Sequence, residues 1–123
     1  MAWKFAADRP IYLQLMEEIT LRVVTGVYEP GDKLPSVREL AAEAEVNPNT
    51  MQRALSELEA TGMINAQRTS GRYVTNDSQL LESYRQNLAR GYIREALQKL
   101  APLGYTPEEV LEMLRQVREE EGQ

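Results

Sequence analysis

The chain has 123 residues, of which 42% are hydrophobic, and its formal net charge at pH 7 is −5. It contains no cysteine and no histidine, which excludes disulfides, thiol or imidazole catalysis, and metal sites that use these ligands. No apolar run approaches the ~20 residues of a membrane span, so we expect a cytoplasmic protein with one compact domain and an appendage, without a cofactor or a membrane partner.

The first helix is predicted to begin at Pro10, because proline favours the first turn of a helix, and to end at Gly26. Gln14 and Arg22 lie off the apolar stripe of this helix. The stripe repeats at helical spacing and predicts the buried side: Tyr12, Met16, Ile19 and Val23, with Leu15 beside them.

Two helix starts within residues 31–58 predict a helix-turn-helix. Ser36 followed by Glu39 is a capping box, in which the hydroxyl accepts a first-turn N–H and the carboxylate reaches back. Asn47 caps a second helix, with Pro48 at its first position. The residues between the two helices suffice only for a tight turn, which is the outline of a helix-turn-helix.

The second of these helices has an apolar side and a polar side. One buried stripe is predicted by the apolar residues Met51, Ala54, Leu55 and Leu58. The opposite side carries hydrogen-bonding side chains that can reach base edges or phosphates: Asn49, Thr50, Gln52, Arg53 and Ser56. An ordinary solvated surface is the alternative, but such a surface usually mixes Glu and Lys, which this side lacks. The pattern therefore favours a DNA-recognition helix.

Two short β-prone segments, residues 63–67 and 72–75, predict a hairpin around a turn at residues 68–71. A helix, a helix-turn-helix and a hairpin, in that order, make a winged helix, so we predict a mainly α fold with a small β-hairpin. The wing tip would carry Arg68, Ser70, Gly71 and Arg72. Two arginines there could simply solvate a loop. Together with the polar helix side they indicate a phosphate or minor-groove contact.

Residues 76–78 mark a boundary, which predicts a DNA-binding domain at 1–76 and a helical extension at 77–123. Thr106 opens the second helix of this extension with another capping box. Two helices of this size bury too little surface to stand alone, so we predict that they form a homodimer interface. Its residues would be Leu81, Tyr84, Leu88, Tyr92, Ala96, Leu100, Val110, Leu114 and Val117.

Three strings of the chain carry a family resemblance: Pro-Ile-Tyr-Leu-Gln-Leu at 10–15, Pro-Gly-Asp-Lys-Leu-Pro-Ser-Val-Arg-Glu-Leu-Ala at 30–41, and Val-Asn-Pro-Asn-Thr-Met-Gln-Arg-Ala at 46–54. With them the chain resembles the GntR family of bacterial transcription regulators over residues ~10 to 75. The short helical tail resembles the YtrA-like subgroup, in which a two-helix extension serves mainly for dimerisation.

The resemblance implies double-stranded DNA as a partner and assigns DNA contacts. In the family, the arginine of the Pro-Ser-x-Arg string meets DNA, as do residues at the start of the recognition helix. The wing usually reads Arg-Gly-x-Gly-Thr-Phe/Tyr-Val, whereas this chain has Thr69 and Arg72 in its middle. The complete predicted DNA-binding set is Ser36, Arg38, Asn47, Pro48, Asn49, Thr50, Gln52, Arg53, Arg68, Ser70, Gly71 and Arg72.

We therefore predict a DNA-binding repressor that binds a palindromic operator as a homodimer, and not an enzyme. The acidic net charge supports the alternative, a winged helix used only for protein contacts. Net charge is a weak guide, however, because the potential near DNA is set by groups within a Debye length of about 8–10 Å. The sequence identifies no small-molecule effector.

Overall fold

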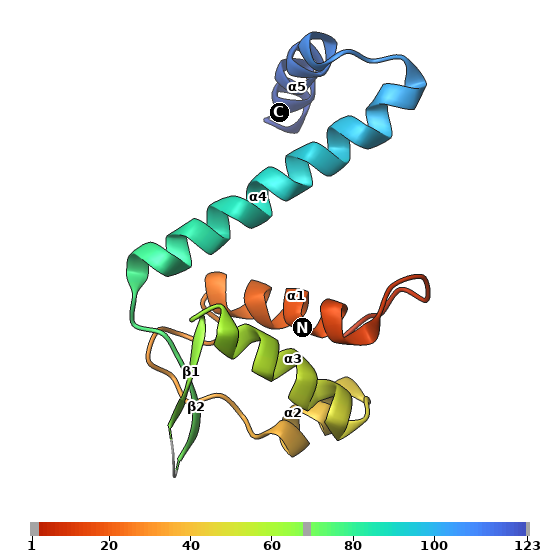
Figure 1. Ribbon diagram of the computed structural model, residues 1–123. Helices are drawn as coiled ribbons and strands as arrows, with labels where there is room; N and C mark the ends of the chain where they lie inside the picture. Colours follow the sequence, from red (N-terminus) through yellow and green to blue (C-terminus); the bar gives the residue numbers. More distant parts are fainter. Residues whose placement is uncertain (1–2, 68–69, 123) are drawn as a thin grey trace. The chain divides into compact units, whose positions relative to one another are not determined.

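The computed structural model describes residues 3–67 and 70–122 and confirms the predicted fold class (Figure 1). The chain divides into two compact units, Met1–Arg85 and Gln86–Gln123. None of the helices in the described residues is long and apolar enough to cross a membrane. The elements are α1 (Ile11–Val24), α2 (Val37–Ala44), α3 (Pro48–Ala60), β1 (Ile64–Gln67), β2 (Gly71–Val74), α4 (Ser78–Leu100), a 3-10 turn (Ala101–Leu103) and α5 (Pro107–Glu121).

The core of the first unit is centred on α3, which packs against α1, α2 and β1. The four residues of the predicted α3 stripe are all buried. They meet apolar side chains from every neighbouring element, and burial of such side chains is the main favourable contribution to folding. The largest fully buried ones are Leu15, Ile19, Leu40, Met51, Leu55, Leu58, Met63, Ile64 and Val74.

The loop before α2 runs antiparallel to β2 and extends the two-stranded hairpin. Lys33 forms an isolated bridge with Tyr73, and the Leu34 amide donates to the Arg72 carbonyl at 2.8 Å. These bonds tie the start of α2 to the wing. At the beginning of the same loop, Gly31 has a φ of +83°, which favours glycine, and a Cβ there would lie 2.9 Å from Oδ1 of Asn76, so another residue would strain the backbone and displace the Asn76 side chain.

Two polar residues that lie off the α1 stripe, Gln14 and Arg22, are buried in the structure. The Gln14 side chain is hydrogen-bonded to the backbone of the N-terminal arm: its Oε1 accepts from the Ala6 amide at 2.6 Å, and its Nε2 donates to the Ala6 and Arg9 carbonyls at 2.8 and 2.9 Å. Tyr12 and Met16, which the stripe placed in the core, are only partly buried. The arm therefore covers a side of α1 that periodicity assigned to solvent.

Arg22, whose side chain is 4% exposed, joins the arm to two helices. Its guanidinium lies 4.2 Å from the centre of the Trp3 ring and forms ion pairs with Glu18 at 3.4 Å and Glu43 at 3.0 Å. The hydrogen bond from Arg22 lowers the pKa of the Glu43 carboxyl. Because the folded-state pKa is depressed, the stabilisation from this pair is present at neutral pH and is lost as the pH falls through that pKa.

The first two turns of α4 belong to the first unit. Leu81 and Tyr84 pack against the core of that unit, and the Tyr84 hydroxyl donates to the Thr61 carbonyl at 3.0 Å. Both residues were predicted to lie in the dimer interface, and within one chain the winged helix already covers part of their surface. The compact unit consequently ends at Arg85, inside the helix.

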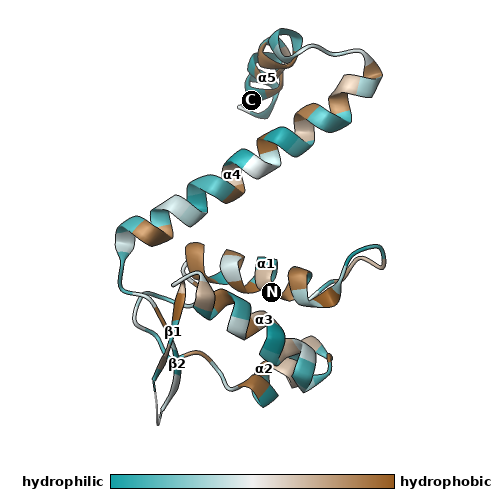
Figure 2. Ribbon diagram, viewed as in Figure 1, coloured by the Kyte–Doolittle hydropathy of each residue, from teal (hydrophilic) through white to brown (hydrophobic). Residues whose placement is uncertain are grey.

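The second unit consists of the rest of α4 and α5, which begins with the predicted capping box. The Glu109 amide donates to Oγ1 of Thr106 at 3.2 Å, and the Thr106 amide donates to the Glu109 carboxylate at 3.1 Å. Hydrophobic and hydrophilic residues alternate along both helices (Figure 2). Within one chain the unit leaves large apolar side chains exposed, namely Tyr92, Ile93, Leu103, Tyr105, Leu111, Leu114 and Val117.

Candidate nucleic-acid interface

The start of α2 presents one capped turn and one exposed cation. Ser36 caps the helix, because its hydroxyl accepts from the Glu39 amide at 3.1 Å while Glu39 accepts from the Ser36 amide at 3.4 Å. The predicted capping box is therefore confirmed. Two residues further on, Arg38 is exposed. An arginine held at a fixed point on the first helix of a helix-turn-helix can pair with a phosphate beside the major groove.

The start of α3 is fixed by the predicted asparagine cap, with Oδ1 of Asn47 accepting from the Asn49 amide at 2.8 Å and Pro48 in the first turn. Downstream, the Gln52 amide donates to the Ser56 hydroxyl at 3.1 Å. Thr50 is half-buried. The exposed residues of the predicted set on this helix are Asn47, Pro48, Asn49, Gln52 and Arg53. A capped helix with this surface has the form of an element that enters the major groove.

Arg53 lies across an aromatic ring from another helix. Its guanidinium carbon is 3.6 Å from the centre of the Tyr12 ring, a cation–π distance. Tyr12 comes from the beginning of α1 and is partly buried against the core. Sequence reasoning placed Tyr12 in the core stripe and did not connect it with Arg53, because no local pattern links residues 12 and 53.

The wing is attached to α3 by an ion pair. Nε of Arg72, on β2, contacts Oε1 of Glu59 near the end of α3. The Arg72 side chain is only 20% exposed, whereas Ser70 and Gly71 are exposed. Arg68, the other predicted wing arginine, lies outside the described residues. The positive charge of Arg72 is thus partly offset inside the protein.

This ion pair yields a stability prediction. Replacing Glu59 or Arg72 with glutamine should lower the free energy of unfolding by about 0.2–1 kcal/mol, as for partly exposed ion pairs. The double variant should lose less than the sum of the two single losses, because both remove the same interaction. Urea unfolding of the four proteins checks the coupling, and strictly additive losses would contradict the pairing.

A groove of about 770 Å³ lies between the start of α2 and the wing. Of the predicted set, it brings together Ser36, Arg38, Ser70, Gly71 and Arg72. The predicted residues on α3 do not line it. Its remaining lining residues include one cation that the predicted set omitted, Lys33, whose Cε lies 3.2 Å from where a Cβ on Gly71 would be.

The charges of this groove favour an anion. Lys33 and Arg38 are both exposed and bring two positive charges. The one carboxylate in the lining, Glu39, accepts the Ser36 amide as part of the capping box. Because local groups set the potential at such a site, the acidic net charge of the chain does not prevent a phosphate from binding here.

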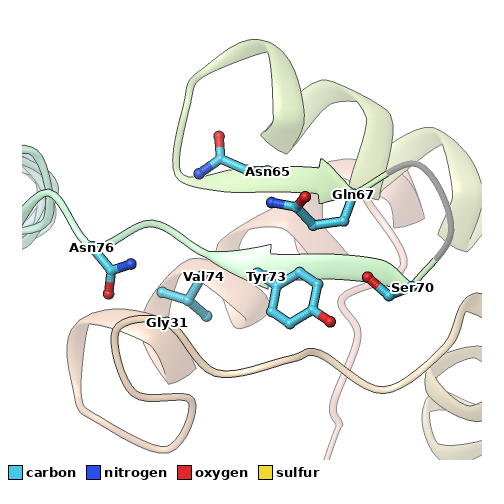
Figure 3. A pocket seen from close by; sticks show the side chains of 7 residues that line it. All are labelled: Gly31, Asn65, Gln67, Ser70, Tyr73, Val74 and Asn76. Carbon is cyan, nitrogen blue, oxygen red and sulfur yellow. The ribbon is translucent and has the colours of Figure 1, made fainter.

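A second, smaller hollow of about 320 Å³ lies along the hairpin (Figure 3). Asn65 and Gln67 reach it from β1, Tyr73 and Val74 from β2, and the remaining lining residues are Gly31, Ser70 and Asn76. All of these residues are uncharged, so the hollow offers no charged partner for a phosphate. We assign it no role in the interface.

Comparison with known proteins finds a family and close relatives. Residues 11–74 match the model of the family described as bacterial regulatory proteins, gntR family. The chain is 38% identical over 112 residues to the uncharacterised HTH-type transcriptional regulator YhcF of Bacillus subtilis, covering 91% of this chain and 93% of that one. It is 42% identical over 72 residues to the HTH-type transcriptional repressor YtrA of the same organism, covering 58% and 55%.

Solved structures of transcriptional regulators are also similar to this chain. A GntR family transcriptional regulator from Listeria monocytogenes superposes with a TM-score of 0.82 at 39% identity, covering 91% of this chain and 98% of that one. The DNA-binding domain of AraR, in complex with operator ORX1, superposes with a TM-score of 0.55 at 26% identity, covering 58% and 93%.

Proposed function

The chain belongs to the gntR family of bacterial regulatory proteins, the family of the predicted resemblance, and on that premise we propose that it represses transcription by binding a two-fold symmetric operator as a homodimer. Its relatives are named as transcriptional regulators, and we infer that this chain is likewise a regulator and not an enzyme. A regulator of this kind acts on the chromosome, so we place it in the cytoplasm. Two similar proteins support the proposal. YtrA is named as a transcriptional repressor, and the DNA-binding domain of AraR was solved in complex with an operator.

The observation that carries the proposal is the exposed polar side of α3, together with the cationic groove between the start of α2 and the wing. In the proposed complex, Asn49 and Gln52 hydrogen-bond to base edges in the major groove, since amide side chains can both donate and accept there. Arg38 and Lys33 neutralise phosphates from the groove. Ser70 and Gly71, at the exposed tip of the wing, approach the neighbouring backbone or minor groove.

The dimer is supported by the apolar residues that the second unit leaves exposed. Leu111, Leu114 and Val117 are 55%, 60% and 43% exposed on α5 within one chain. Apolar side chains gathered in this way mark an interaction surface. A second copy of the chain fits best, because a two-fold protein dimer matches a palindromic operator and supplies the second recognition helix that specific binding requires.

The second candidate function, a winged helix that contacts only proteins, rests on the acidic net charge of −5. It predicts no salt-dependent affinity for DNA. The proposed DNA-binding function predicts that the logarithm of the association constant for DNA falls linearly with the logarithm of salt concentration, because phosphates that bind the protein release counterions.

We expect Arg38→Gln to make that slope shallower by about one unit, the effect of one lost phosphate contact. The matched control is Arg90→Gln, which removes the same charge from an exposed residue of the second unit and should keep the parental slope. Fluorescence anisotropy with a labelled duplex of about 30 base pairs measures both. Equal slopes for all three proteins would remove Arg38 from the interface, and the absence of any salt dependence would favour the second candidate.

A further inference from the structure

The contact between Tyr12 and Arg53 joins the beginning of α1 to the exposed side of α3. Arg53 has a glutamate, Glu57, four residues further along the same helix, a spacing that favours a surface ion pair. In the part of the chain that the structure describes, no ion pair forms between them, and the guanidinium lies on the Tyr12 ring at 3.6 Å instead. The described contact of the Arg53 guanidinium is therefore with the Tyr12 ring and not with the Glu57 carboxylate.

Stacking on a ring leaves the edges of a guanidinium available. The five N–H donors of arginine lie in the plane of the group, whereas a cation–π contact uses its flat face. Within the described residues the Arg53 donors have no protein acceptor, and the residue is exposed. An anion that approaches the edge can therefore accept two parallel N–H bonds without displacing Tyr12.

Tyr12 is itself held in place. It lies in the first turn of α1 and is partly buried against the same core that holds α3, and α1 packs directly on α3. The ring is thus a rigid support that orders an otherwise mobile side chain before any ligand arrives. Ordering a long side chain in advance removes part of the entropy cost of binding.

We propose that Tyr12 is a positioning residue of the DNA interface, which holds the Arg53 guanidinium ready for a backbone phosphate at the exposed side of α3, next to the beginning of α1. This inference rests on the proposed function. It extends the interface from the helix-turn-helix and the wing to α1, a helix that the predicted DNA-binding set leaves out. Tyr12 acts through Arg53, so the ring face matters and the phenol hydroxyl does not.

Four variants test this: Tyr12→Phe, Tyr12→Leu, Arg53→Gln, and the double variant Tyr12→Leu/Arg53→Gln. Binding to a random-sequence duplex of about 30 base pairs is measured by anisotropy over a range of salt, because phosphate contacts do not require the operator. Circular dichroism melting of each protein gives the folded fraction, so that affinity is expressed per folded molecule.

Tyr12→Phe should bind as the parent does, and Tyr12→Leu should bind about two- to fivefold more weakly, the range of an exposed cation–π contact. Arg53→Gln should make the salt slope shallower by about one unit. In that background, Tyr12→Leu should have no further effect, whereas a purely structural role of the ring would weaken binding equally in both backgrounds.

The proposal is overturned if Tyr12→Leu keeps the parental affinity, or if its loss is the same with and without Arg53. It is also overturned if Arg53→Gln leaves the slope unchanged. A failure of the proposed function would give a different result. The parent protein itself would then show no salt-dependent binding to the duplex, and the proposed role of Tyr12 would be wrong as well.

Discussion

Leu114→Glu in α5 is expected to turn the proposed homodimer into a monomer and to weaken operator binding by at least about 100-fold. Leu114 is 60% exposed within one chain, so the substitution should not disturb the fold of either unit. In a dimer the new carboxylate would be buried without a partner, which is strongly unfavourable. The affinity falls because two linked recognition helices gain about 10²–10⁴ over separate ones.

The matched control is Gln116→Glu, which adds the same charge two residues away at an exposed polar position of α5. It should keep both the dimer and the affinity. Sedimentation at micromolar concentration and anisotropy with the operator measure the two effects. A parent protein that sediments as a monomer, or a Leu114→Glu monomer that binds the operator as tightly as the parent, would contradict the proposed dimer.

Leu55→Ala is expected to lower the free energy of unfolding by about 2–5 kcal/mol, because it leaves a cavity in a packed core. Leu55 is 1% exposed and lies in the stripe of α3 that faces α1 and α2. Its loss should destabilise the domain without removing any group from the DNA-facing side. Affinity per folded molecule should therefore remain close to that of the parent.

Ser56→Ala, on the exposed side of the same helix, is the control and should change stability by less than about 0.5 kcal/mol. Denaturant unfolding provides the comparison. If Leu55→Ala unfolds no more easily than Ser56→Ala, then the packing of α3 is looser than the structure indicates.

Local signals in the sequence were sufficient to predict the helix-turn-helix. The capping box of Ser36 and Glu39 and the cap of Asn47 involve residues at most three apart, and such short-range chemistry marks helix starts directly. The apolar period of α3 likewise predicts which of its sides is buried. The polar side then follows by elimination, and with it most of the candidate interface on this helix.

Contacts between distant parts of the chain were not predictable in this way. Helical period placed Gln14 and Arg22 off the buried stripe, but the N-terminal arm supplies the hydrogen-bond partners of Gln14 and the Trp3 ring that lies against Arg22. A polar side chain is buried where it finds hydrogen-bond partners, and those partners are set by tertiary structure. The same holds for the Tyr12 ring beneath Arg53, which joins two helices far apart in sequence.

The wing and the start of α4 show a related limit. Turn composition predicted the hairpin, and β1 and β2 pair in register from Ile64 with Val74 to Gln67 with Gly71. Turn composition could not show, however, that Arg72 would pair with Glu59 on α3. The apolar side of α4 was read as one continuous surface, whereas Leu81 and Tyr84 at its beginning pack on the first unit.

The central claim is that two copies of this chain read a symmetric DNA sequence through α3. Its most direct test is to select duplexes from a random pool with the purified full-length protein and to sequence those that bind. The account predicts an inverted repeat whose half-sites lie about one helical turn, or a multiple of it, apart, and predicts that the repeat is lost when Asn49 and Gln52 are both replaced by alanine. A selection that enriches no sequence, or only a single unpaired half-site, would contradict it.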